Sequence, residues 1–98
     1  MRVISRKVLR EFGAAGHADA ELALRAWFEE AESADWQGPA DIKKFYPSAS
    51  ILGKERVVFN IRGNRYRLVV AIKYEFRIVY IRFVGTHAEY DKINCLEV

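Results

Sequence analysis

Residues 57–73 decide the fold, and they read VVFNIRGNRYRLVVAIK. Two runs rich in β-branched and aromatic side chains flank the pair Gly63-Asn64, whose residues tolerate the positive φ angles of a tight turn. This pattern predicts a β-hairpin with strands at about 56–62 and 65–74. Alternation along the second strand turns its even-numbered apolar residues toward one face and leaves Arg67 and Lys73 on the other.

Outward from this hairpin, the period-two pattern predicts two more strands, at about 51–54 and 76–84, and Val3-Ile4 fits a short opening edge strand. A period closer to 3.6 predicts helices over 6–14, with Ser5 as N-cap, and over roughly 18–34. The inward stripe of the second helix is expected to consist of Leu22, Ala23, Ala26 and Trp27. One helical turn is expected over 40–45.

These elements predict an α+β fold in which two N-terminal helices pack on one face of a curved antiparallel β-sheet, with a short C-terminal helix. The 98 residues are expected to form a single domain, 1–98. No apolar run approaches the ~20 residues needed to cross a bilayer, so no membrane association is expected. Cys95 is the only cysteine, which excludes an internal disulfide and favours a reducing, cytoplasmic setting.

The charge is distributed unevenly. Residues 18–41 hold seven acidic residues and one basic residue, Arg25, whereas residues 54–84 hold eight basic and two acidic residues. A basic segment of this kind favours polyanions through phosphate contacts, and we prefer this reading to a merely solvated sheet face. The acidic helix is most simply a solvated face; a weaker hypothesis is that it meets a basic segment of a partner.

A second informative motif is Thr86-His87-Ala88-Glu89, which fits a capping box at the start of a helix. The box accounts for Thr86 and Glu89 but not for His87 and Tyr90, which are three residues apart and share one side of the first turn. An imidazole can gain or lose a proton near pH 7, and a helix N-terminus favours anions. The alternatives, an exposed surface histidine and a core tyrosine, carry about equal weight.

Metal and nucleophile sites are poorly supported. Only His17, His87 and Cys95 offer soft ligands, and they are too few and too scattered for a zinc site; no metal or other cofactor is therefore expected. What remains is phosphate chemistry by arginines, Lys73, His87 and Tyr90. That set suits RNA cleavage, because the 2′-OH is an internal nucleophile and the protein need only orient it, move protons and stabilise the charged phosphorane.

The C-terminal two-fifths of the chain resembles the HigB toxins, within the RelE superfamily of mRNA interferases. The resemblance is carried by Val58-Phe59-Asn60-Ile61-x-Gly63-Asn64, by the strand Tyr66-Arg67-Leu68-Val69-Val70-Ala71, by Tyr80-Ile81-Arg82 and by Thr86-His87-x-Glu89-Tyr90-Asp91. It implies a RelE-like microbial RNase fold and a ribosome-dependent endoribonuclease that cuts mRNA in the ribosomal A site. It also implies a helix-turn-helix (HigA-like) antitoxin, through which alone the toxin would meet operator DNA.

The resemblance also implies roles for individual residues. Arg67 falls at the strand arginine that contacts the scissile phosphate, and His87 and Tyr90 fall in the C-terminal segment that supplies acid/base groups. Asn60 and Arg62 lie near a strand where RelE uses lysines, so the base is open here and Lys73 is a weak substitute. The side chains expected to bind RNA or its phosphates are those of Asn60, Arg62, Arg65 and Arg82.

A non-catalytic RNA-binding or protein-interaction module on the same scaffold is the alternative, since exposed basic and aromatic side chains suffice for binding. In such a module, replacement of His87 or Tyr90 would leave the biological effect unchanged.

Overall fold

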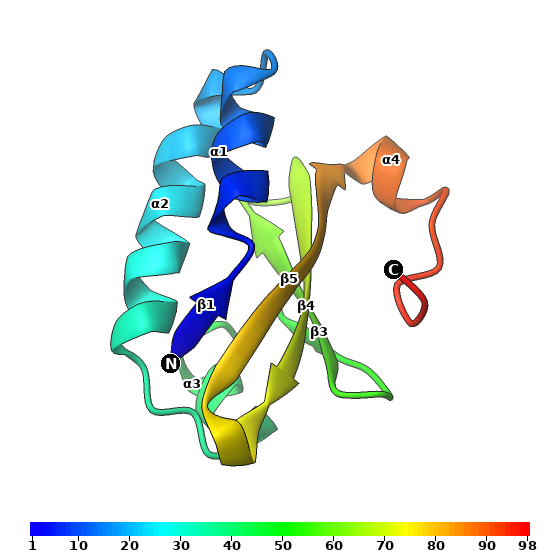
Figure 1. Ribbon diagram of the computed structural model, residues 1–98. Coiled ribbons are helices and arrows are strands. Elements are labelled where there is room, and N and C mark those ends of the chain that lie inside the picture. Colours follow the sequence, from blue (N-terminus) through cyan, green and yellow to red (C-terminus); the bar gives the residue numbers. More distant parts are fainter.

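The computed structural model describes residues 1–98 and contains a five-stranded sheet with the two long helices on one side and a short C-terminal helix on the other (Figure 1). The strands lie in the order β1-β5-β4-β3-β2. The elements are β1 (Arg2–Ile4), α1 (Arg6–Ala14), α2 (Ala18–Ser33), α3 (Pro39–Phe45), β2 (Ser50–Ile51), β3 (Arg56–Ile61), β4 (Tyr66–Lys73), the 3-10 helix η1 (Tyr74–Phe76), β5 (Ile78–Thr86) and α4 (His87–Tyr90). The predicted α+β class is confirmed.

The sheet is mixed rather than fully antiparallel. Strands β2 to β5 pair antiparallel, as predicted, but β1 pairs with β5 in parallel, with Val3 opposite Val79. The parallel pairing is possible because three helices and three strands separate β1 from β5 in the chain, which gives the long crossover that parallel strands need. The expected edge position of Val3-Ile4 is confirmed.

Helix α1 has the predicted bounds, but the capping role of Ser5 is wrong. Ser5 adopts a left-handed conformation with φ 75°, and its side chain makes no capping hydrogen bond. Its carbonyl oxygen accepts from the Val8 N–H at 3.0 Å instead. The chain therefore turns from β1 into α1 through a strained residue rather than through a side-chain cap.

The phase of α2 also differs from the prediction. Its buried residues are Ala20, Leu24, Trp27, Phe28 and Ala31, whereas Leu22 is 73% exposed. Trp27 is buried as predicted and Ala23 packs partly against the core, but the buried stripe is rotated about the helix axis relative to the predicted one, so that Leu22 and Ala26 are exposed.

The core lies between the sheet and the two long helices and is centred on Phe59, which is fully buried. Its ring lies 5.4 Å from that of Trp27, 6.1 Å from that of Trp36 and 5.0 Å from that of Tyr46. These aromatic contacts join α2, the α2–α3 connection and α3 to the middle of the sheet. No helix is long and apolar enough to span a membrane.

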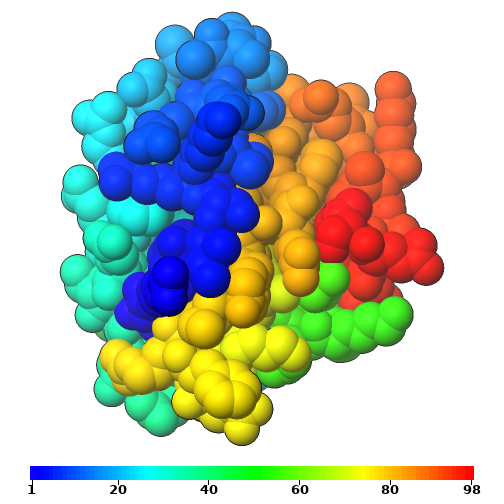
Figure 2. Space-filling model, viewed as in Figure 1, coloured from blue at the N-terminus to red at the C-terminus, as the bar shows by residue number.

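The other side of the sheet is partly covered by α4 and the residues that follow it (Figure 1). Val58, Val69 and Ala71 are almost fully buried there although they lie outside the main core cluster. The C-terminal residues pack against neighbouring segments in the space-filling view (Figure 2), and the Arg56 guanidinium donates to the Val98 oxygen at 3.0 Å.

Candidate active site on the outer face of the sheet

We use "outer face" for the sheet face opposite α1 and α2. It carries Arg56, Val58 and Asn60 of β3, Arg67, Val69, Ala71 and Lys73 of β4, and Tyr80, Phe83 and Gly85 of β5. Paired residues on adjacent antiparallel strands have side chains on the same face, so the register alone groups these residues. The even-numbered residues of β4 point into the core, as predicted.

Arg67 lies near the start of β4, between Asn60 on β3 and Gly85 on β5. One guanidinium nitrogen, Nη1, donates to the carbonyl oxygens of Asn64 at 3.2 Å and Tyr66 at 3.3 Å. The side chain is half-buried and has no carboxylate partner within 4.0 Å. Its positive charge is therefore held in one orientation without being neutralised, which suits a phosphate ligand.

Tyr90 brings its ring to the same place from α4. The Arg67 guanidinium carbon lies 5.9 Å from the centre of that ring. The phenol hydroxyl lies 3.8 Å from the Cys95 sulfur. Burial, and then the contact with Cys95, raises the pKa of Tyr90 above its usual value of 10.0. The phenol therefore stays protonated at neutral pH and can donate a hydrogen bond or a proton.

His87 begins α4 and lies half-exposed, with Nδ1 3.1 Å from Asp91 Oδ2. A carboxylate at that distance orients the imidazole and leaves its Nε2 atom free. The expected capping box is present, because the Thr86 hydroxyl accepts from the Glu89 N–H at 3.2 Å and the Glu89 carboxylate accepts from the Thr86 N–H at 2.8 Å. These bonds hold the turn that presents His87 and Tyr90.

The helix N-terminus itself is less available to anions than the sequence suggested. Helix α4 has only four residues, so its dipole is small. Two of its first N–H groups already have partners, since the His87 N–H donates to the Arg65 oxygen at 3.1 Å and the Glu89 N–H to Thr86. Any contribution of α4 to an anion site here must therefore come chiefly from its side chains.

Asn60 joins the site and Lys73 does not. Asn60 is directly opposite Arg67 on β3, and its amide donates to the Ser48 oxygen at 3.2 Å. Lys73 is at the other end of β4, six residues from Arg67, which corresponds to roughly 20 Å along a strand. Its amine is paired with Glu55. We therefore leave Lys73 out of the group around Arg67.

Arg62 and Arg65 flank the β3–β4 turn and point toward α2. Asp19 Oδ2 lies 3.6 Å from Arg62 Nε and 2.9 Å from Arg65 Nη1, and Asp19 Oδ1 accepts from the Tyr66 hydroxyl at 2.5 Å. The Tyr66 hydrogen bond, more than the two arginines, holds the pKa of Asp19 below its usual value. In the turn, positive φ falls on Arg62 and Gly63 rather than on Gly63 and Asn64.

A bulge in β5 places Phe83 on the outer face next to Arg82. Between Val69 and Val70 the β4–β5 register shifts, so that Phe83 pairs with Val69 and Ile81 with Val70. Arg82 is the extra residue, and its guanidinium carbon lies 5.6 Å from the Tyr80 ring. Strict alternation from Tyr80 predicts Arg82 on this face but would turn Phe83 toward the core, because it takes no account of the extra residue in a bulge.

Sequence reasoning missed the pair Phe83 and Gly85. A Cβ atom on Gly85 would lie 2.5 Å from Phe83 Cζ and 3.2 Å from Glu89 Cβ. The Phe83 ring therefore crosses the strand position directly beside Arg67, and the missing side chain lets both the ring and α4 approach. The only signal in the sequence is a glycine inside a strand, which often marks a close approach.

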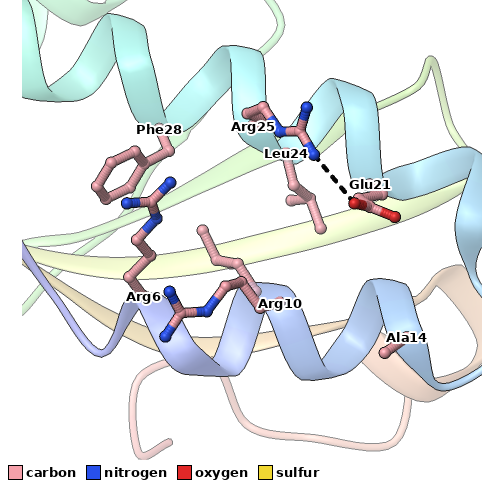
Figure 3. A pocket seen from close by; sticks show the side chains of 8 residues that line it. Arg6, Arg10, Ala14, Glu21, Leu24, Arg25 and Phe28 are labelled. Atoms are coloured by element: carbon pink, nitrogen blue, oxygen red, sulfur yellow. Dashed lines mark hydrogen bonds and ion pairs between the residues drawn. The ribbon is translucent and has the colours of Figure 1, made fainter.

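No group of three or more His, Cys, Asp and Glu side chains is arranged to hold a metal ion. A cavity of about 220 Å³ lies between α1 and α2, behind the sheet. Its apolar floor includes Leu24 and Phe28, and Arg6, Arg10 and Arg25 line its sides (Figure 3). The Arg6 guanidinium lies 4.1 Å from the centre of the Phe28 ring, and Arg25 pairs with Glu21 at 3.1 Å. This cavity is separate from the group around Arg67.

Comparison with known proteins adds an independent observation. Residues 20–93 match the HigB toxin family, described as the RelE-like toxic component of a toxin-antitoxin system. Proteins named mRNA interferase toxin HigB, from Escherichia coli, and mRNA interferase HigB, from Shigella flexneri, are each 30% identical over 93 residues, covering 93% of this chain and 88% of the relative. A second Escherichia coli protein named mRNA interferase HigB is 24% identical over 96 residues, covering 96% and 92%.

Proposed function

This chain belongs to the HigB toxin family and is an endoribonuclease toxin of a toxin–antitoxin system, and we propose that it cleaves mRNA bound in the ribosomal A site. The relatives that cover most of its length are named mRNA interferases, and the outer face holds groups suited to RNA cleavage. The observation that carries the proposal is the contact of Arg67 with the Tyr90 ring, with His87 in the same helical turn.

In the proposed mechanism the ribose 2′-OH attacks the scissile phosphorus and displaces the 5′ oxygen of the next nucleotide. The products are a 2′,3′-cyclic phosphate and a 5′-hydroxyl. Arg67 binds the nonbridging phosphate oxygens and stabilises the charge that grows on them in the transition state. Because its charge has no internal carboxylate partner, it is available for this interaction.

Two proton transfers accompany the attack. His87, oriented by Asp91, accepts the proton of the 2′-OH through its free nitrogen. Tyr90, whose phenol is protonated at neutral pH as in any tyrosine, donates its proton to the leaving 5′ oxygen. Asn60 and Arg82 contact the flanking nucleotides from the same face, while Arg62 and Arg65 contact RNA only at the rim, since Asp19 already binds them.

The partners follow from the family. Toxin–antitoxin membership implies an antitoxin, which we propose is a helix-turn-helix protein of the HigA type. The toxin would reach operator DNA only through that protein. Translating ribosomes place the proposed activity in the cytoplasm.

The test is induced expression in a bacterial host with mapping of cellular mRNA 5′ ends. Wild type and Arg25→Ala, which removes an arginine behind the sheet, are expected to arrest growth and to produce cuts in phase with the reading frame. Arg67→Ala and His87→Ala are expected to lose both effects. Growth arrest in all four strains without new mRNA ends would mean that the toxicity is not RNA cleavage and would favour a binding module.

Ribosome dependence has its own test with purified components. The wild-type toxin is expected to cleave mRNA in a programmed ribosome and to leave the same mRNA intact when it is free. Equal cleavage of both would contradict the A-site proposal while leaving the nuclease activity in place.

A further inference from the structure

A second and larger hollow in the surface, which we call the α2–α3 groove, lies on the helix side of the sheet, opposite the outer face. It has a volume of about 790 Å³ and is formed by the last turn of α2, the connecting segment and α3. Pockets of about 300–1,000 Å³ are large enough to enclose a drug-sized ligand or a few side chains. The proposed cleavage mechanism makes no use of this groove.

The groove is rich in aromatic side chains. Trp36, Phe45 and Tyr46 line it, and the Trp36 ring meets the edge of Tyr46 at 6.5 Å. Trp36 is buried beneath it, whereas Phe45 is 76% exposed at the end of α3. Exposure of a phenylalanine ring to water beside a hollow is unfavourable, and covering the ring with a partner would lower the free energy.

The charged residues of the groove select the kind of partner. Three carboxylates line it, those of Glu30, Asp35 and Asp41, and the only basic lining residue is Lys44. Asp35 is paired with Arg77, so Glu30 and Asp41 are the two carboxylates without a basic partner, and the groove keeps a negative balance. Such a surface repels phosphate, which excludes an RNA backbone. Aromatic rings near carboxylates suit an arginine or lysine, because the cation can lie over a ring while it pairs with an acid.

We propose that the α2–α3 groove docks a basic segment of the antitoxin, one that carries arginine or lysine next to an apolar side chain. The antitoxin is the protein partner that the family supplies, and charge complementarity points to a basic stretch of it. The groove lies behind the sheet, so a segment bound there does not itself touch Arg67. The inference rests on family membership and not on RNA cleavage.

The experiment titrates purified toxin with the purified product of the adjacent antitoxin gene by calorimetry. Phe45→Ala is expected to weaken binding by about tenfold or more, as removal of an aromatic anchor typically does. The matched control is Phe76→Ala, which removes a phenylalanine that is 67% exposed on η1, outside the groove. The control is expected to leave the affinity unchanged.

A charge variant tests the chemistry of the partner. Lys44→Glu makes the groove more acidic and is expected to strengthen binding several-fold at low salt, with less effect at high salt because ions screen the added charge. Weaker binding of Lys44→Glu would mean that the partner segment is acidic and would overturn the proposal. So would unchanged affinity of Phe45→Ala.

The same Phe45→Ala variant distinguishes the antitoxin from two other possible partners of the groove, the ribosome and a second copy of the toxin. If Phe45→Ala keeps its antitoxin affinity but loses cleavage of ribosome-bound mRNA, the groove meets the ribosome. If it changes only the molar mass of the toxin alone in light scattering, the groove meets a second copy. Either result overturns the proposal. A wild-type toxin that binds antitoxin but cuts no mRNA would instead count against the proposed function alone.

Discussion

Arg67 and Tyr90 belong to β4 and α4, yet the Arg67 guanidinium carbon lies 5.9 Å from the centre of the Tyr90 ring. This is within the ~6 Å over which a cation is attracted by an aromatic face. The contact places a fixed positive charge beside a phenol whose pKa is raised by burial. A phosphate bound to Arg67 would therefore lie beside the Tyr90 phenol, as the proposed mechanism needs.

The role of Tyr90 can be divided between proton donation and packing. Tyr90→Phe keeps the ring beside Arg67 but removes the donor, and it should slow single-turnover cleavage of ribosome-bound mRNA by about 100-fold or more, the usual contribution of a general acid. Tyr90→Ala loses both functions and should be slower still. Wild-type rates in Tyr90→Phe would show that the ring serves for stacking or packing only.

Lys73 should be dispensable for cleavage. Its amine pairs with Glu55 at the far end of β4, roughly 20 Å from Arg67 along the strand. Lys73→Met is therefore expected to retain the wild-type single-turnover rate within about twofold, since it removes only a surface ion pair of small energy. A rate loss comparable to that of Arg67→Ala would restore Lys73 as a catalytic candidate.

Asp19 should stabilise the fold in a pH-dependent way. Its pKa is held below the usual 3.8, chiefly by the Tyr66 hydroxyl, so the stabilisation is present above that value and is lost as the pH falls through the lowered pKa. Asp19→Asn should lower the urea midpoint at neutral pH. The difference from wild type should shrink in acid well below pH 3.8.

The control for this experiment is Glu21→Gln, which breaks a more exposed pair with Arg25 on the same helix. It should change the urea midpoint little at either pH. A gap between Asp19→Asn and wild type that stays constant from neutral to acid pH would contradict the assigned cause.

A side chain at Gly85 can be accommodated only if the Phe83 ring moves. A Cβ atom there would lie 2.5 Å from Phe83 Cζ, so Gly85→Ala must displace the ring and should lower the free energy of unfolding. Overpacking of this kind costs about 1–3 kcal/mol. Measured by urea unfolding in a Phe83→Ala background, the same change should cost clearly less, because the clash is gone. If Gly85→Ala lowered the free energy of unfolding equally in the wild-type and Phe83→Ala proteins, the Phe83 ring would not be the cause of the loss.

Much of the fold follows from local patterns in the sequence. The alternation in residues 57–73 and the Thr86–Glu89 capping box identify the hairpin and the C-terminal turn, because both depend on residues within a few positions of each other. The bounds of α1 follow in the same way. The family resemblance, carried by these same segments, extends to a match over residues 20–93.

The candidate site was less accessible to such reasoning. The sequence offered Arg62, Arg65 and Arg67 as phosphate ligands and the family resemblance singled out Arg67, but only the structure shows that Asp19 of α2 binds the first two and leaves Arg67 without a carboxylate. The bulge at Arg82 and the close approach of Phe83 to Gly85 depend on how β4 pairs with β5.

The sequence by itself determined the class of fold, the two faces of β4 and the family, because hydrophobic period and short motifs are properties of neighbouring residues. Only the tertiary structure decided the phase of α2, the parallel pairing of β1, the exclusion of Lys73 and the meeting of Arg67 with Tyr90. These features depend on contacts between segments far apart in the chain, where register and packing select one arrangement among several that the local pattern allows equally.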